Sequence, residues 1–251
     1  MTARRTLPFA AALALLAGCG GTSPPAAAPS ATAVVSVSAS PSVKPVTPRE
    51  ELKAAVGRLL KTPYGFSLIG DYPQRQKVRA FGAQDAAAGK LTRTVVVTGG
   101  PDRKFRKLIV IGTDSYRGED NSGYWVHADL SRLKPGNEYY GADPKDPSGL
   151  IRFEQAVTVT RRTGPRTFQG EAWIMPGITL LPLGAPNLSF REGVSVDYTA
   201  TTDAQNRLTS ISIDIAKGAM KQTMTITYDK PVTIAKPAKA DELRKSLYDK
   251  P

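Results

Sequence analysis

Apolar residues that alternate with polar ones are the feature that most limits how this chain can fold. The alternation runs through residues 64–228 in short stretches, for example at Phe66 and Leu68. Stretches rich in turn-forming residues, such as 99–102 and 203–206, separate these runs. A strand with this pattern buries one side of a sheet, and the short spacing leaves little room for crossover helices. The sequence therefore predicts a long antiparallel meander.

Two helices are expected to accompany this sheet. Thr47, Pro48 and Glu50 form a capping-box pattern, since Thr47 can accept from the first helix amides while Glu50 reaches back. An apolar stripe at helical spacing follows, made up of Leu52, Ala55, Val56, Leu59 and Leu60. A second helix is expected over about 147–155, with Asp146 as its cap.

The start of the chain has the pattern of an export signal. Arg4 and Arg5 precede an uncharged apolar run over 7–17, and the chain's only cysteine, Cys19, follows at once. The sequence Leu-Ala-Gly-Cys at 16–19 resembles the lipobox of bacterial lipoproteins. We therefore interpret residues 1–18 as a lipoprotein signal peptide and predict that Cys19 carries diacylglycerol after cleavage. The alternatives are an ordinary secretory peptide that ends near a cysteine, or a buried apolar thiol.

The lipidated cysteine is followed by a segment rich in Pro, Ala, Ser and Thr. Residues 19–47 contain too few apolar side chains to offset the entropy of ordering, so we expect a disordered tether. Residues 48–251 are long enough to form a single domain with its own core. This organisation predicts a protein anchored by lipid on the extracytoplasmic face of the cell membrane.

The chain is strongly basic. Its formal charge of +12 falls to +10 once Arg4 and Arg5 are removed with the signal peptide. Export makes nucleic acid an unsuitable partner, whereas an anionic membrane surface would attract these charges. The basic run 103–107 could contact lipid head groups in the same way, or it could be a solvated start of a strand.

Residues with catalytic or metal-binding chemistry are scarce. His127 is the only histidine, so a metal site built on histidines is excluded, and a catalytic triad would have to use this residue. Several carboxylates cluster loosely in the sequence, namely Asp114, Glu119, Asp120 and Asp129, but nothing sets a pair of them at the separation that glycoside hydrolysis needs. We interpret His127 as a polar residue at a strand end and expect no enzymatic activity, cofactor or metal. A hydrolase built around His127 is the alternative.

One uncharged segment, residues 172–190, breaks the strand rhythm. Its prolines and glycines rule out a regular membrane-spanning helix. It can be a buried edge of the core or an apolar flap around a ligand entrance.

Four stretches carry a resemblance to a known family: LIVIGTDSYRG at 108–118, GYWVHADL at 123–130, DPSGLIRF at 146–153 and TYDKPVTIAKP at 227–237. Together with the lipobox, the tether and the N-terminal helix, they resemble the LolA-like carriers, and more closely the LppX/LprG group of actinobacterial lipoproteins. The resemblance implies an α+β half-barrel, in which a long curved antiparallel sheet wraps around a few short helices. It also implies an apolar cavity that holds the acyl chains of lipids or lipoglycans.

By this resemblance, the candidate lining residues are Phe66, Leu68, Phe81, Val95, Val97, Ile109, Ile111, Trp125, Leu150, Phe153 and Trp173. For each of them, packing in an ordinary core is the alternative role. The function expected is to bind acyl chains and to carry or present lipids across the cell envelope as a monomer, with a membrane transporter or sensor as partner. An envelope sensor or protein-binding lipoprotein of the same fold, without lipid transport, is the second hypothesis.

Overall fold

The computed structural model describes residues 45–99, 104–119, 122–134, 137, 139, 146, 148–175, 192–215, 218, 220–229 and 232–249. Residues 45–251 form one compact unit, distinct from 1–44. The predicted signal peptide, Cys19 and nearly all of the tether lie outside the described residues.

The first helix, α1 (Pro48–Leu59), begins with the predicted capping box. The hydroxyl of Thr47 accepts from the amide of Glu50 at 3.3 Å, and the Glu50 carboxylate accepts from the Thr47 amide at 2.8 Å. These reciprocal bonds satisfy donors that an uncapped helix start leaves open. The buried side of the helix comprises Leu52, Ala55, Val56 and Leu59, as the spacing predicted, while Leu60 caps the C-terminus and is partly buried.

Twelve strands form one sheet in the described part of the chain, in the order β12-β6-β5-β4-β3-β2-β1-β11-β10-β9-β8-β7. The strands of one arm are β1 (Tyr64–Tyr72), β2 (Gln76–Asp85), β3 (Lys90–Thr98), β4 (Lys104–Ile111), β5 (Asp114–Gly118) and β6 (Val126–Asp129). Those of the other arm are β7 (Val157–Gly164), β8 (Thr167–Ile174), β9 (Val194–Thr202), β10 (Leu208–Ile215) and β11 (Met220–Thr227). The short β12 (Asp241–Glu242) completes the sheet.

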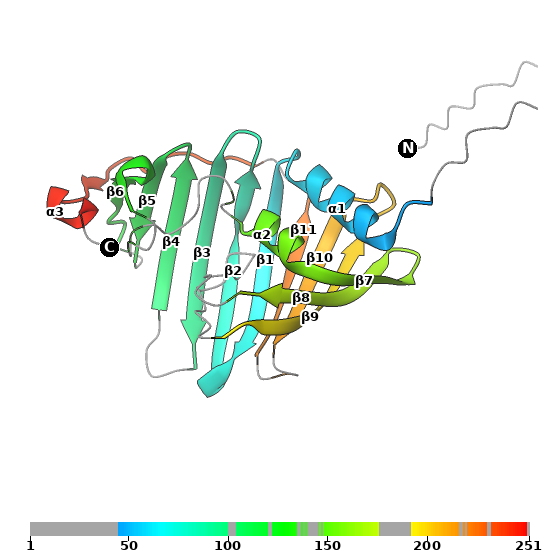
Figure 1. The fold of residues 1–251 in the computed structure, drawn as a ribbon. Helices are drawn as coiled ribbons and strands as arrows, with labels where there is room; N and C mark the ends of the chain where they lie inside the picture. Colours follow the sequence, from blue (N-terminus) through cyan, green and yellow to red (C-terminus); the bar gives the residue numbers. More distant parts are fainter. Residues whose placement is uncertain are drawn as a thin grey trace, which may run out of the picture. The chain divides into compact units, whose positions relative to one another are not determined.

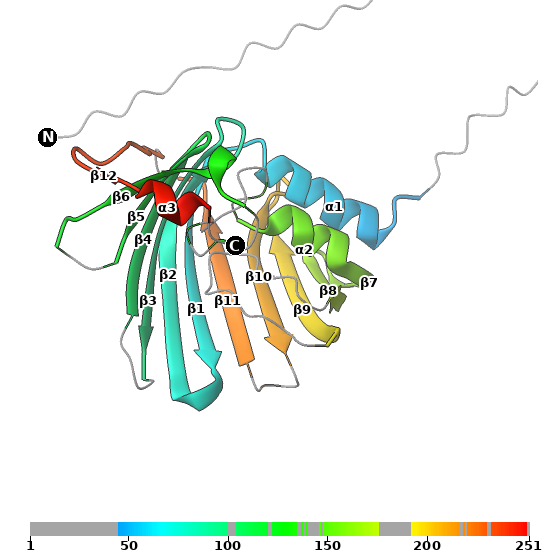
Figure 2. The same ribbon diagram turned by 60° about the vertical axis from the view of Figure 1, so that its left-hand side comes forward.

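The predicted antiparallel meander is confirmed within each arm, where consecutive strands are neighbours. Two pairings go beyond a meander. The arms are joined by β1 and β11, which lie far apart in the chain, and β12 pairs with β6 in parallel. The sheet curves without closing on itself, so the α+β half-barrel expected from the sequence is the observed fold (Figures 1 and 2).

Two glycines allow neighbouring strands to approach each other unusually closely. A Cβ atom on Gly82 of β2 would lie 1.9 Å from the carbonyl oxygen of Thr92, and one on Gly170 of β8 would lie 1.8 Å from that of Val159. No side chain fits at such distances, so only glycine permits the backbone to pass there. Close approaches of this kind accompany sharp bends in a sheet.

The second helix, α2 (Leu150–Ala156), starts three residues later than the sequence predicted. Its N-cap position is Gly149, yet the Asp146 carboxylate still accepts from the amides of Ile151 at 3.2 Å and Arg152 at 2.9 Å. The predicted capping role of Asp146 is therefore confirmed, although the residue stands outside the first turn.

Both helices lie over the β7–β11 arm (Figures 1 and 2). Helix α1 contacts β7, β10 and α2, and α2 contacts β8. Arg49 of α1 donates to the carbonyl oxygen of Glu154 in α2 at 2.7 Å, which ties the two helices together. We call the side of the sheet that they cover the inner face. The remaining short elements are the turns η1 (Pro73–Arg75) and η2 (Leu130–Arg132) and the helix α3 (Lys245–Tyr248).

Candidate functional site

The inner face of β1–β3 is a continuous apolar surface. Leu68, Ala80 and Val95 lie directly opposite one another across the three strands and are 1%, 2% and 7% exposed. Residues two positions away along each strand point the same way, so Phe66 and Val97 extend this surface. The strands thus present side chains of the kind that could contact an acyl chain.

Six of the predicted lining residues lie on the inner face or on α2, which covers it. All six are buried, namely Phe66, Leu68, Val95, Val97, Leu150 and Phe153. The first four lie on neighbouring strands of one arm. Leu150 and Phe153 lie on α2, over the other arm, where the Phe153 ring packs edge-on against Tyr198 with a centroid separation of 5.4 Å. Whether a lipid contacts these residues stays a prediction.

The prediction that Ile109 and Ile111 face the interior is wrong. Leu108 and Val110 are the buried residues of β4, at 5% and 0% exposure, and register places Ile109 opposite Thr92 on the outer face. Residues 108–111 are all apolar, so an alternating pattern does not show whether 108 and 110 or 109 and 111 point inward. Cross-strand pairing decides it, and the sequence missed Leu108 and Val110.

Phe81, Trp173 and Trp125 also lie on the outer face. Phe81 is 54% exposed and Trp173 46% exposed, because their inward neighbours are Ala80 and Ile174. The Trp125 ring is partly buried and lies over Gly118, 3.5 Å from where a Cβ atom on that glycine would be. The alternation of Val78 and Ala80 could already have excluded Phe81 from the inner face. We therefore remove these three residues, with Ile109 and Ile111, from the candidate lining.

Two hydrogen-bonded pairs of polar side chains lie on the inner face. The Tyr64 hydroxyl donates to Oε1 of Gln84 at 2.6 Å, and the Tyr72 hydroxyl donates to Oε1 of Gln222 at 2.7 Å. Burial raises the pKa of both tyrosines, so they stay neutral at physiological pH. The sequence missed these pairs because their members come from different strands.

His127 lies in β6 on the outer face, as a polar strand residue, which matches its sequence interpretation. Its Nε2 lies 2.8 Å from Oδ1 of Asp114 and its Nδ1 lies 2.7 Å from Oε1 of Glu242, while the ring stacks on Tyr116. Burial alone would lower the pKa of His127, but the two carboxylates raise it overall. Because both ring nitrogens are engaged by carboxylates, the ring is poorly placed to activate a nucleophile.

Of the four loosely clustered carboxylates, Asp114 contacts His127, and Asp120 lies outside the described residues. Asp129 instead accepts from the amide and hydroxyl of Ser131, while Glu119 is exposed. The sequence missed Glu242, which arrives from β12. No group of three or more acidic, histidine or cysteine side chains suited to a metal ion occurs in the described ranges.

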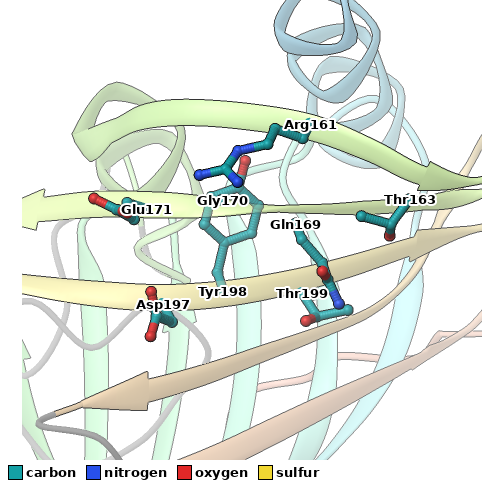
Figure 3. A pocket seen from close by; sticks show the side chains of 8 residues that line it. All are labelled: Arg161, Thr163, Gln169, Gly170, Glu171, Asp197, Tyr198 and Thr199. Carbon is teal, nitrogen blue, oxygen red and sulfur yellow. The ribbon is translucent and has the colours of Figure 1, made fainter.

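A shallow groove lies on β7–β9 (Figure 3), lined by Arg161, Thr163, Gln169, Gly170, Glu171, Asp197, Tyr198 and Thr199. Most of its lining is polar, and Glu171 lies directly opposite Asp197 across the strands. Such a surface does not suit acyl chains, which favour apolar walls.

The two segments for which the sequence left alternatives are only partly described. Residues 176–190 of the uncharged segment lie outside the described residues, and within β8 the segment alternates between buried Ala172 and Ile174 and exposed Trp173. In the basic run, Arg106 is exposed and the Lys107 ammonium lies 5.3 Å from the centroid of the Phe105 ring.

Comparison with solved structures finds folds similar to this one. The lipoprotein LppX of Mycobacterium tuberculosis is 15% identical, with a TM-score of 0.44, and the match covers 74% of this chain and 97% of LppX. An uncharacterized conserved protein of Thermus thermophilus is 10% identical, with a TM-score of 0.42, over 77% of this chain and 98% of its own. No family model and no curated protein matches the sequence.

Proposed function

We propose that this protein is a non-enzymatic lipid-binding lipoprotein, which holds acyl chains against the apolar inner face of its half-barrel and carries or presents them in the cell envelope. The observation that carries the proposal is the row of Leu68, Ala80 and Val95 on the inner face of an open, curved sheet. This row lies on β1, β2 and β3, whereas the helices α1 and α2 contact strands of the β7–β11 arm.

The physical need for such a protein follows from the cost of exposing hydrocarbon to water. Each methylene group brought into water costs about 0.8 kcal/mol, so a 16-carbon chain costs roughly 13 kcal/mol. A lipid therefore crosses an aqueous compartment only with its chains covered. An antiparallel sheet with one apolar face can provide that cover while its other face stays hydrated.

Attachment to the membrane through Cys19 forms part of the proposal. No helix in the described portion of the chain is both long and apolar enough to cross a bilayer. Replacing Cys19 with Ser should remove the thioether site and shift the protein from the detergent phase to the aqueous phase of a detergent-partitioning assay. Partitioning like that of the wild type, with diacylglycerol still attached, would refute the anchor.

The function is tested by native mass spectrometry on the full chain carrying Cys19→Ser, released into solution from its own cell envelope. We expect a mass increment from bound lipid, released by organic extraction. A clean ligand-free mass from several independent preparations would contradict the proposal.

A second candidate is a protein-binding envelope sensor with the same fold. Two exposed apolar side chains on the outer face favour it, since Ile69 is 63% exposed and Phe81 54% exposed on adjacent strands. Apolar surface of this kind is used for protein contacts. A ligand-free mass together with a partner lost on Phe81→Ser would support the sensor.

A further inference from the structure

Three arginines interrupt the apolar inner face on β3, β4 and β5. Arg93 lies directly opposite Leu108, which lies opposite Arg117. Leu108 is 5% exposed and points inward, and side chains directly opposite in a sheet share a face, so both arginines extend from the inner side. Arg106 lies opposite the buried Val95 and therefore joins them. We call these three residues the basic cluster.

The members of the basic cluster repel one another. Burial, followed by the charges of Arg117 and Arg106, lowers the pKa of Arg93 to about 10. All three guanidinium groups would attract an anion bound beside them. Groups perturbed in this way are commonly found at functional sites.

One member is held in a defined orientation. The Arg117 guanidinium lies 5.4 Å from the centroid of the Tyr139 ring. A cation positioned over an aromatic face gains electrostatic attraction, which limits its movement. A planar guanidinium also offers paired N–H donors that match phosphate or carboxylate oxygens.

The cluster adjoins the apolar surface proposed to hold acyl chains. Along one row across the sheet, Phe66 lies opposite Gly82, and Gly82 lies opposite Arg93. The row therefore changes from an aromatic side chain to a position without a side chain, and then to a cation. This succession matches an amphiphile whose chain ends in an anionic group.

We propose that Arg93, Arg106 and Arg117 bind the anionic head group, a phosphate or a carboxylate, of the lipid whose chains occupy the neighbouring inner face. The inference rests on the proposed function and specifies its ligand class. It predicts selection for anionic amphiphiles over neutral ones of equal chain length.

The test compares dodecyl phosphate with dodecanol, which share a chain and differ in the head group. Each is titrated into the full chain carrying Cys19→Ser, preloaded with the neutral fluorescent probe N-phenylnaphthylamine. We expect dodecyl phosphate to displace the probe at about tenfold lower concentration than dodecanol, as charge-assisted hydrogen bonds would give. Inorganic phosphate alone should leave the probe in place.

Substitutions test which residues cause the preference for dodecyl phosphate over dodecanol. Arg93→Gln and Arg117→Gln should reduce the preference to less than about threefold without changing the affinity for dodecanol. Arg106→Gln, at an exposed position, should act in the same direction and serves if the others fail to fold. Arg79→Gln is the matched control, because Arg79 lies in β2 on the outer face and should preserve the wild-type preference.

Four outcomes would overturn the inference. Equal displacement by the two compounds, or an undiminished preference in all cluster variants, would show that the basic cluster does not bind the head group. Either result would leave the proposed lipid binding in place. Displacement by inorganic phosphate as effective as that by dodecyl phosphate would point to a free anion instead of a lipid. Failure of both compounds to displace the probe would refute the proposed function together with the inference.

Discussion

Nδ1 of His127 lies 2.7 Å from Oε1 of Glu242, and this contact joins the end of the chain to the edge of the sheet. The backbone reinforces it, since the amide of Leu243 donates to the carbonyl oxygen of His127 at 2.8 Å. On its other side, Nε2 of His127 faces Asp114 at 2.8 Å. The imidazole therefore bridges β5 and β12 and is best held when it is protonated.

This bridge predicts a pH dependence of stability. The pKa of His127 is raised in the folded protein, because its two carboxylate partners outweigh burial of the ring. The stabilisation should be complete below the unfolded-state value of about 6.5 and should vanish as the pH rises through the raised folded value. Because both carboxylates are largely exposed, we expect less than about 1 kcal/mol.

The measurement is urea unfolding of the wild type and His127→Gln at about pH 5.5 and about pH 8.5. The difference in unfolding free energy between the two proteins should be larger at the lower pH. A difference that stays constant, or grows with pH, would show that the bridge does not depend on protonation.

The close approach at Gly82 predicts a strong effect of adding one methyl group. In Gly82→Ala the new Cβ would meet backbone atoms of Thr92 that cannot move aside without bending the sheet. We expect a loss of more than about 2 kcal/mol in the free energy of unfolding, measured by chemical denaturation.

Gly57→Ala is the matched control for Gly82→Ala. A Cβ on Gly57 meets no atom within 4 Å, and the residue lies inside α1, so alanine should stabilise the protein by about 0.5–1 kcal/mol. Equal effects of the two substitutions would contradict the account of the sheet bend.

The capping role of Asp146 predicts a further loss of stability. Asp146→Ala removes the acceptor for two amides of the first turn of α2 and should cost about 1 kcal/mol. Asp146→Asn keeps one carbonyl oxygen as an acceptor, so its free energy of unfolding should lie between those of the wild type and the alanine variant. If Asn and Ala are equally destabilising, the contribution of Asp146 lies in its charge instead of its hydrogen bonds.

The parts of the fold that depend on neighbouring residues could be predicted from the sequence. Thr47 and Glu50 are three positions apart, so the capping box is visible in the sequence. Each strand of a hairpin is likewise visible, because apolar and polar residues alternate within it. The pairing of β1 with β11 joins distant segments, and no local pattern encodes it. The alternation therefore predicted an antiparallel meander, and the family resemblance implied a half-barrel, but neither predicted how its two arms meet.

The candidate site was harder to predict for the same reason. The phase of β4 is ambiguous over 108–111, and only pairing with β3 turns Leu108 inward and Ile109 outward. The basic cluster likewise forms because Arg93 and Arg117 come from strands on either side of β4. The sequence indicates apolar residues one by one, whereas the pairing of the strands determines which of them share a face.

Fluorescence quenching with a brominated fatty acid measures whether acyl chains lie on the inner face. Both native tryptophans lie on the outer face and are replaced by Phe, and a single reporter is then introduced as Phe66→Trp on the inner face or Phe81→Trp on the outer face. Thermal melts first establish that both variants fold. The account predicts saturable quenching of the reporter at position 66 and little quenching of the one at 81. Equal quenching at both positions, or quenching confined to 81, would contradict it.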